Sequence, residues 1–271
     1  MTHAWLIIAH NEFGILQRLV TTLDDSECDI YIHIDRKVSV LPTILVERSR
    51  LTFLEDRVDV RWGSVSQIRC EFALFEAAAT HGPYDYYHII SGTTLPLKPF
   101  EEIDRFFDKN DGNCLLSGLC QSTSYQEMLK VRRYNLFLNG YASRNAVRRH
   151  FCQFFWKSAI AIQKLLGIMV NRDKVFYKAS NWLSLTEDAV RYILSRKKDI
   201  LKTYRYSFCG DEYFVPSELM DSPLKDTLVN SEHYLLHNIS RSNASTYRLG
   251  EYEALCNTDY MFARKFTEEE K

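Results

Sequence analysis

Residues 4–37 read AWLIIAHNEFGILQRLVTTLDDSECDIYIHIDRK, and this stretch decides the fold. Its first six residues form a continuous apolar run, which is typical of a strand that is buried on both faces of a sheet. Apolar residues then recur at helical spacing over 14–23, and a second apolar run covers 28–34. The segment therefore predicts a strand, a helix and a strand, which is the repeating unit of a parallel α/β sheet.

The same alternation continues through the first 120 residues. Strands are predicted at 58–62, 86–90 and 114–116, and helices at 65–80 and 100–107. Ligands of such sheets bind beyond the carboxyl ends of the strands. Polar or aromatic side chains and one glycine fall at these ends: His10, Asn11, Asp35, Arg36, Trp62, Ser91, Gly92 and Thr93.

The second half of the chain has a different pattern. Residues 125–170 are rich in arginine and aromatic residues, and the run FWKSAIAIQKLLGIMV (155–170) predicts an amphipathic helix. Further helices are predicted at 186–197 and 249–255. No repeat or Pro/Gly-rich linker interrupts the chain, so we expect one α/β domain over 1–271, with helices on both faces of a mostly parallel sheet.

Composition excludes several classes of protein. The chain has 34 Lys and Arg against 35 Asp and Glu, whereas a general nucleic-acid binder needs a strong basic surplus. The N-terminus lacks the basic region of a signal peptide, and no apolar run approaches the roughly 20 residues of a membrane span. The seven cysteines show no C-x-x-C pair, which is typical of reduced thiols. We therefore expect a cytoplasmic protein, free or held at a membrane surface.

Cationic residues near the C-terminus are candidate ligands for a diphosphate. The sequence has no D-x-D pair to hold Mg²⁺ or Mn²⁺, no P-loop and no G-x-G-x-x-G. If a diphosphate leaves in the reaction, Arg and Lys side chains are the natural substitute for a metal ion. Arg264 and Lys265, between two phenylalanines, are the first candidates, and Arg241 and Arg248 are weaker ones. The alternative for Arg264 and Lys265 is an ordinary surface charge pair.

An acidic pair, Asp211 and Glu212, lies in the segment FCGDEYF. A carboxylate in a partly apolar cleft can act as a general base that takes a proton from a hydroxyl. The alternative is an N-cap followed by a first-turn acid at the start of a helix.

Other polar residues suit contact with a nucleoside or a sugar. Asp35 ends a predicted strand, where it can bind a ribose hydroxyl, and Trp62, Ser64 and Trp182 are candidates for contact with a sugar or a base. An ordinary strand turn and core aromatic residues are the alternatives. His10, His33 and His88 show no zinc spacing, so no metal site is expected. Cys209 has no base in its pattern and is not expected to be a nucleophile.

Seven segments in order resemble the core-2/I-branching enzyme family. They are IIAHNEFGILQRLVTTL, YIHIDRK, VRWGSVSQIRCEFALFEAA, YHIISGTTLPLK, ASNWLSLTEDAVRYIL, CGDEYFVPSEL and FARKF, and together they extend from about residue 4 to residue 267. The family includes β-1,6-N-acetylglucosaminyltransferases, peptide O-xylosyltransferases and bacterial relatives. The resemblance implies a GT-A-like fold, an inverting mechanism and independence from metal.

The resemblance also implies roles for individual residues. Glu212 matches the catalytic base, while Lys265 and Arg264 match the donor-diphosphate site. Arg241 matches a second phosphate ligand by spacing, with Arg248 as the alternative. Asp35 resembles a nucleoside contact. Residues resembling the lining of the sugar site are Ser180 and Trp182.

The resemblance leaves the donor and the acceptor open. In SGTTLPLK this chain has Thr94, where many relatives carry an acid that can touch the donor sugar. UDP-GlcNAc and UDP-xylose are the donors that the resemblance favours, and residues 125–170 give no match for the acceptor. A glycan or a lipid-linked glycan of a surface polysaccharide is the expected acceptor. We expect residues 4–120 to bind the nucleotide sugar and residues 121–271 to bind the acceptor and supply catalysis.

Two further alternatives concern activity and location. A nucleotide- or carbohydrate-binding protein of the same fold without catalysis is the alternative function, and a hydrolase is a weaker third. The basic stretch with its helix, residues 148–170, predicts contact with an anionic membrane, on the cytoplasmic face of the inner membrane. The alternative is a helix packed in the core beside a basic acceptor loop.

Overall fold

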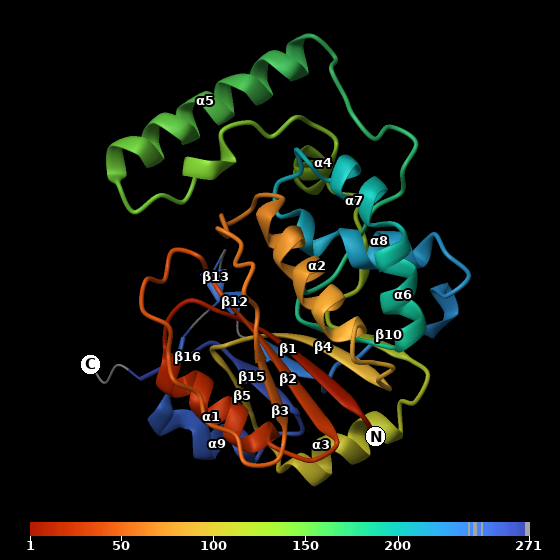
Figure 1. Ribbon diagram of the computed structural model, residues 1–271. Coiled ribbons are helices and arrows are strands. Elements are labelled where there is room, and N and C mark those ends of the chain that lie inside the picture. Colours follow the sequence, from red (N-terminus) through yellow and green to blue (C-terminus); the bar gives the residue numbers. More distant parts are fainter. Residues whose placement is uncertain (238, 241–242, 245, 269–271) are drawn as a thin grey trace.

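The computed structural model covers the chain and describes residues 1–237, 239–240, 243–244 and 246–268. Its centre is a seven-stranded sheet in the order β10-β6-β9-β4-β1-β2-β3 (Figure 1). These strands are β1 (His3–Ala9), β2 (Cys28–Ile34), β3 (Arg50–Phe53), β4 (Tyr86–Ser91), β6 (Cys114–Leu116), β9 (Leu183–Leu185) and β10 (Leu228–Asn230).

The central sheet is mixed but mostly parallel. β1 runs parallel to β2 and β4, β2 runs parallel to β3, and β10 runs parallel to β6. Only β9 is antiparallel to its neighbours β4 and β6. The carboxyl ends of β1, β2 and β4 therefore meet at one edge, as the sequence predicts for a ligand site.

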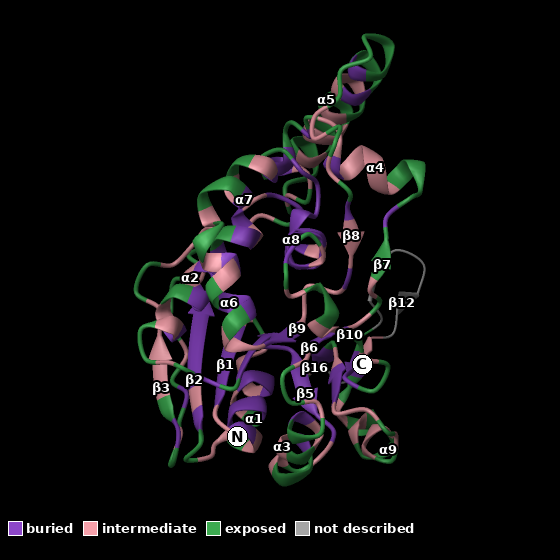
Figure 2. Cartoon of the chain, turned by 90° about the vertical axis from the view of Figure 1, so that its right-hand side faces the viewer, coloured by how far each residue is buried: buried purple, intermediate pink, exposed green. Residues whose placement is uncertain are grey.

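Helices cover both faces of this sheet (Figures 1 and 2). The apolar run of β1 serves both faces, because successive side chains of a strand point to opposite sides: Leu6 packs with α2, α6 and α8, and Ile7 packs with α1 and α3. These helices are α1 (Phe13–Leu23), α2 (Ser66–Ala79), α3 (Phe100–Asp108), α6 (Glu187–Ser195) and α8 (Phe214–Met220). The predicted α/β architecture is confirmed.

A smaller sheet and several short elements complete the fold. The small sheet has the order β11-β15-β5, with β11 (Leu235–His237), β15 (Phe262–Arg264) and β5 (Thr94–Pro96). Short strands pair as β7 (Cys120–Gln121) with β8 (Tyr177–Lys178), β12 (Ile239–Ser240) with β13 (Asn243–Ala244), and β14 (Tyr247–Arg248) with β16 (Phe266–Thr267). The remaining helical segments are α4 (Tyr125–Val131), α5 (Ala146–Leu165), α7 (Lys197–Thr203), α9 (Tyr252–Cys256), η1 (Leu138–Gly140), η2 (Gly210–Glu212), η3 (Lys225–Thr227) and η4 (Leu249–Glu251).

The predicted strand at 58–62 is wrong, and β3 takes its place beside β2. Side chains bind the backbone of the 58–62 segment instead of a neighbouring strand: Val58 N–H donates to His33 Nε2 at 2.8 Å, and Lys37 Nζ donates to the Val60 carbonyl at 2.5 Å. Trp62 consequently does not follow a strand.

The helix predicted at 155–170 begins earlier and ends earlier, as α5. Asn145 caps its N-terminus, because the side chain accepts a hydrogen bond from Arg148 N–H. At the other end Gly167 adopts φ +63°, and Ile168 N–H donates to the Gln163 carbonyl at 2.9 Å. Arg148 and Arg149 therefore lie in the first turn of the helix, while Arg132, Arg133 and Arg144 precede it. No helix in the described ranges has the length and hydropathy to cross a bilayer.

Candidate functional site

Three predicted residues lie at the shared carboxyl edge: His10 follows β1, Asp35 follows β2 and Ser91 ends β4. Asp35 N–H donates to the Ala9 carbonyl, so the ends of β2 and β1 are joined directly. The Asp35 carboxylate accepts hydrogen bonds from Lys37 N–H and from Lys37 Nζ at 2.6 Å. Gly92 lies so close to β1 that a Cβ there would stand 2.6 Å from Ala9 Cβ. The edge is therefore tightly built around His10, Asp35 and Ser91.

Arg264 lies in the strand that closes this edge. β15 pairs antiparallel with β5, which places Arg264 opposite Thr94. The guanidinium stacks over Trp182 at 4.5 Å from the ring centroid, and its Nη1 lies 3.1 Å from His237 Nε2. Burial lowers the pKa of Arg264 to about 10. Its Nε is buried and makes no hydrogen bond, and no carboxylate pairs with it in the described part of the chain.

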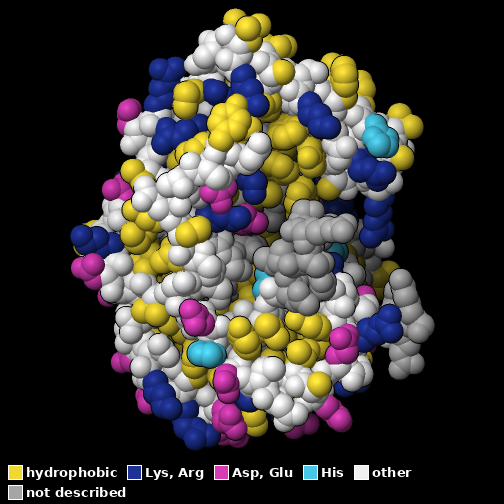
Figure 3. All heavy atoms as spheres, turned by 180° about the vertical axis from the view of Figure 1, so that it is seen from behind, with side chains coloured by type: hydrophobic (Ala, Val, Ile, Leu, Met, Phe, Trp, Pro, Cys, Tyr) yellow, Lys and Arg dark blue, Asp and Glu magenta, His cyan; other side chains and the backbone are white. Residues whose placement is uncertain are grey.

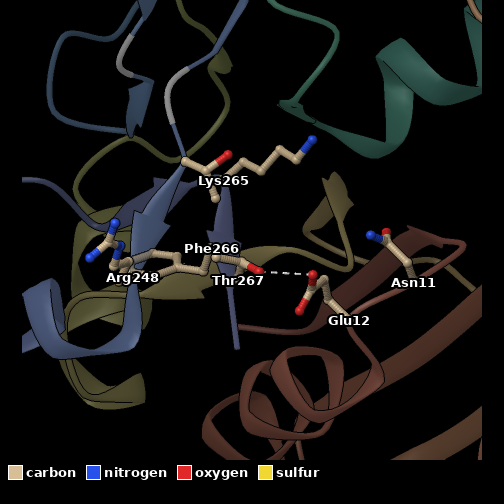
Figure 4. A pocket seen from close by; sticks show the side chains of 7 residues that line it. Asn11, Glu12, Arg248, Lys265, Phe266 and Thr267 are labelled. Atoms are coloured by element: carbon tan, nitrogen blue, oxygen red, sulfur yellow. Dashed lines mark hydrogen bonds between the residues drawn. The ribbon is translucent and has the colours of Figure 1, made fainter. Parts of the chain in front are cut away.

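Lys265 is exposed beside an open cavity of about 390 Å³. Figure 4 shows its ammonium extending across the cavity toward the side of Asn11, away from the hydrogen bond between Thr267 and Glu12. The pKa of His10 is lowered, first by partial loss of solvation, with Lys265, Lys37 and Arg144 adding to the shift against Asp35. The charge of Lys265 is therefore felt at the end of β1, where His10 lies. Its ammonium forms no ion pair within the described ranges.

Arg241 and Arg248 are the two predicted candidates for a second phosphate ligand. Arg241 lies outside the described residues. Arg248 is exposed, lines the same cavity and caps η4, but its guanidinium lies on the opposite side of Phe266 from Asn11 (Figure 4). Arg248 and Lys265 thus point to different sides of the cavity.

Glu212 lies in the short helix η2, after a turn in which Cys209 has φ +53°. Its carboxylate is about one third exposed and lies 3.4 Å from Lys178 Nζ and 3.8 Å from Lys130 Nζ. These two ammonium groups balance its charge while leaving the side chain accessible. Neither lysine is singled out by a sequence motif.

Asp211 lies beneath Glu212 and is 4% exposed. Its Oδ2 accepts a hydrogen bond from Gln67 Nε2 at 2.7 Å, while its Oδ1 is buried without a partner. Burial, followed by the charge of Glu212, raises the pKa of Asp211 to about 7. Glu71, also buried, has its pKa raised by burial and by Asp211. The alternative interpretation of the acidic pair, an N-cap and first turn of a regular helix, is wrong. The pair lies in η2, and α8 begins only at Phe214 with Tyr213 as its N-cap.

A short path of backbone and ring contacts connects Glu212 with Arg264. The Glu212 carbonyl accepts a hydrogen bond from Ala179 N–H. The hydroxyl oxygen of the next residue, Ser180, accepts a hydrogen bond from Trp182 N–H at 3.3 Å. The ring of Trp182 then lies beneath Arg264. Residues predicted from separate motifs are thus joined through one segment, 179–182.

The other predicted residues differ in accessibility. Ser64 is buried and bonds to Ser66, and Ser91 is buried and bonds to the hydroxyls of Thr93 and Thr94. Trp62 is 52% exposed, stacks on Tyr141 with ring centroids 6.0 Å apart, and meets Phe208 edge to face. His33 and His88 are buried, and no group of His, Cys, Asp and Glu in the described ranges is placed to hold a metal ion.

Sequence reasoning missed four residues that surround the predicted ones. Lys130 and Lys178 flank Glu212, and Gln67 and Glu71 lie against Asp211. Gln67 and Glu71 occur one turn apart in SVSQIRCEF, on the helix after the RWGS motif, which was the available signal. No comparable signal marks the lysines.

Comparisons with known proteins identify a family and two solved structures of low similarity. The model of the Core-2/I-Branching enzyme family matches residues 3–254. Mouse xyloside xylosyltransferase 1, in its apo form, is similar with a TM-score of 0.41 and 8% identity, over 97% of this chain and 96% of that one. S. aureus TarS is similar with a TM-score of 0.30 and 12% identity, over 49% of this chain and 25% of that one. No curated protein matches.

The family match covers nearly the whole chain, from the start of β1 into α9. It includes Glu212 and the strand-end residues, and it stops before Arg264 and Lys265. The expected α/β fold with a mostly parallel central sheet is confirmed. This protein belongs to the core-2/I-branching enzyme family of glycosyltransferases.

Proposed function

We propose that this glycosyltransferase moves a sugar, GlcNAc or xylose, from a UDP-sugar to a hydroxyl of an acceptor glycan, with inversion and without a bound metal ion. The observation that carries the proposal is the pair of adjacent cations, Arg264 and Lys265, beside the strand ends without carboxylate partners in the described residues. The family is typically independent of metal, and the sequence lacks D-x-D.

The donor diphosphate supplies the negative charge that these cations lack. A half-buried guanidinium bonds strongly to phosphate oxygens, because its donors are fixed and poorly solvated. Trp182 and His237 hold the Arg264 guanidinium in place before the donor arrives, and Lys265 reaches from the exposed side. Preorganised cations of this kind stabilise charge that develops on a leaving group.

Glu212 is the proposed base. It removes the proton from the acceptor hydroxyl, the oxygen attacks the anomeric carbon, and the bond from that carbon to the diphosphate oxygen breaks. UDP leaves with its new charge held by Arg264 and Lys265, and a single displacement inverts the anomeric centre. Lys130 and Lys178 lie beside the Glu212 carboxylate and orient it in the free enzyme.

The remaining residues divide between contact and support. Asp35 and His10 are proposed nucleoside contacts, with Ser180 and Trp182 around the sugar. The burial of Asp211, Ser64, Ser91 and Thr94 favours a supporting role beneath the site over direct contact with the sugar. Asp35 is buried too, but its carboxylate bonds to the exposed Lys37. Residues 4–120 would then bind most of the nucleoside, and residues 121–271 would supply catalysis and acceptor contacts.

Trp62 and Tyr141 offer a platform for the acceptor. Stacked rings with one exposed member are suited to the apolar face of a sugar. Their neighbour Phe208 precedes the turn that positions Glu212. We place the reaction in surface polysaccharide synthesis on the cytoplasmic side of the membrane; all seven cysteines are free thiols, which supports a reducing compartment.

A nucleotide-sugar screen in EDTA tests the donor. Thermal stabilisation by UDP-GlcNAc or UDP-xylose in EDTA supports the assignment, and stabilisation that requires a divalent cation contradicts it.

A second assay separates transfer from its alternatives. UDP release that depends on the acceptor identifies a transferase, release without acceptor identifies a hydrolase, and binding without release identifies a binding protein that has lost catalysis.

A further inference from the structure

Helix α5 presents an apolar face that the protein does not cover. Figures 1 and 2 show α5 at the end of the molecule opposite α1 and α3, with other elements along one side of it. Val147 is 80% exposed, Phe154 is 65% exposed and Leu165 is 87% exposed. The sequence alternative of a core-packing helix is therefore wrong, because only Ile160 and Gln163 of α5 are buried.

The exposed apolar residues share one face of α5. At about 100° per residue, positions i, i+4, i+7, i+15 and i+18 fall on the same side of a helix. These positions are occupied by Val147, Phe151, Phe154, Ile162 and Leu165, and all five are exposed.

The opposite face of α5 is the one that holds the helix to the protein. Trp156 Nε1 donates to Asn135 Oδ1 at 2.9 Å, and Gln163 exchanges hydrogen bonds with the backbone of Tyr134. Gln153 also donates to the Tyr141 carbonyl. Since these anchors lie about half a turn from the apolar residues, the apolar face points directly away from the protein.

The surroundings of this face are strongly basic. Residues 128–172 contain nine Lys or Arg and no Asp or Glu, whereas the rest of the chain carries 25 basic and 35 acidic residues. Arg148 projects on one flank of the apolar face, and Lys157 and Lys164 project on the other. Figure 3 shows hydrophobic and basic side chains gathered at this end of the molecule.

Charge decides which partner suits the surface. A second copy of the chain packed through the same face would bring two sets of nine cations together, and like charges repel. An anionic bilayer offers hydrocarbon for the apolar face and lipid headgroups for the flanking cations. A helix of 20 residues is about 30 Å long, enough to lie along the surface as an anchor.

We propose that α5 docks this glycosyltransferase onto an anionic membrane, lying in the plane of the interface with Phe151, Phe154 and Leu165 inserted among the lipids. Arg144, two residues before the start of α5, contributes to the lowered pKa of His10, so the segment that leads into α5 approaches the strand-end site. A lipid-linked acceptor held at the docked surface would be presented from this side. The docking itself does not depend on which sugar is transferred.

Vesicle flotation of the purified full chain tests the proposal. Wild-type protein is expected to float with vesicles of phosphatidylcholine and phosphatidylglycerol, and not with phosphatidylcholine alone. The double variant Phe154→Ser with Leu165→Ser should lose at least roughly tenfold in partitioning, because it removes apolar surface that inserts. Arg148→Glu with Lys157→Glu should lose a comparable factor through charge.

A matched control removes exposed apolar residues elsewhere. Val40 and Leu45 are 79% and 69% exposed on a loop outside α5, so Val40→Ser with Leu45→Ser should float like the wild type. Unchanged thermal melting of each variant shows that folding is intact. Raising ionic strength from about 0.1 M to about 0.5 M should weaken flotation, since it shortens the Debye length.

Three results would overturn the proposal. One is equal flotation of the wild type and the Phe154/Leu165 variant. Another is equal binding to vesicles with and without phosphatidylglycerol. The third is a dimer in light scattering that this variant converts to monomer, which would assign the face to a second copy. UDP release with a soluble acceptor measures the proposed transfer reaction separately. The docking proposal and the proposed function can therefore be contradicted independently of each other.

Discussion

The two ends of the proposed site differ in whether their charged side chains have partners of opposite charge. At one end Glu212 is an anion with two lysine partners at 3.4 and 3.8 Å. At the other end Arg264 and Lys265 are cations without a carboxylate partner among the described residues. The anion has its partners in the free protein, while the proposed partner of the cations is the donor diphosphate. The difference supports the proposal that the Glu212 end activates a neutral hydroxyl and that the Arg264 end holds a diphosphate.

The largest expected effect comes from Glu212→Gln. The amide keeps the size of the side chain but cannot take a proton, so kcat should fall by about 10²- to 10⁴-fold. UDP affinity, measured by calorimetry, should stay within about twofold because the cation end is untouched. A variant with wild-type kcat would remove Glu212 from the mechanism and break the division between the ends.

The next effect concerns Lys265→Ala. A hydrogen bond to a charged group is worth about 1.5–3 kcal/mol, so UDP affinity should fall by about 10- to 100-fold. The side chain is exposed, so thermal stability should hardly change. Lys98→Ala, a half-buried lysine that donates to the Cys256 carbonyl, serves as control and should bind UDP normally. Equal UDP affinity in wild type and Lys265→Ala would leave this end without its assigned ligand.

The Asp211→Asn variant tests the acidic end through stability. The pKa of Asp211 rises from 3.8 to about 7 on folding, so between these values the folded protein keeps a proton that the unfolded chain has lost. Stability contributed by this group therefore falls as pH rises through that window. Asparagine removes the buried charge, so the melting temperature should rise by a few degrees at pH 8 and hardly at all near pH 4. Melting curves that shift equally at both pH values would contradict this.

The smallest effect is expected from Trp62→Ala, which sharpens the boundary between donor and acceptor contacts. The loss of a stacked ring should raise the KM for the acceptor by about fivefold, corresponding to roughly 1 kcal/mol, with little change in the KM for the donor. Phe208→Leu, which keeps a buried apolar side chain, separates packing from stacking. A rise confined to the donor KM would place Trp62 at the nucleotide instead.

The fold was largely predictable because its central strands are long apolar runs. β1, β2 and β4 match their predicted ranges closely, since burial on both faces demands continuous hydrophobicity. The edge strand β3 was not predicted, because its sequence, RLTF, is short and partly exposed. The helix α5 was predicted from its apolar second half alone, although Asn145 was a visible capping signal for its true start.

The site was predictable only where a motif marks it. Glu212, Arg264 and Lys265 stand in segments that resemble a known family, and their roles remain predictions. Lys130 and Lys178 approach Glu212 from α4 and β8, which are far apart in sequence. Such contacts depend on tertiary packing, and ordinary lysines carry no local pattern that reveals it.

The position of β9 has a consequence for how the chain is made. This strand, Leu183–Leu185, is inserted between β4 and β6, both of which are translated much earlier. While the ribosome is still short of residue 185, β6 has no neighbour that joins it to β4, and the sheet stays split with open edges. Sheet closure must therefore wait for the later half of synthesis, and a fragment ending near residue 120 should aggregate instead of folding by itself.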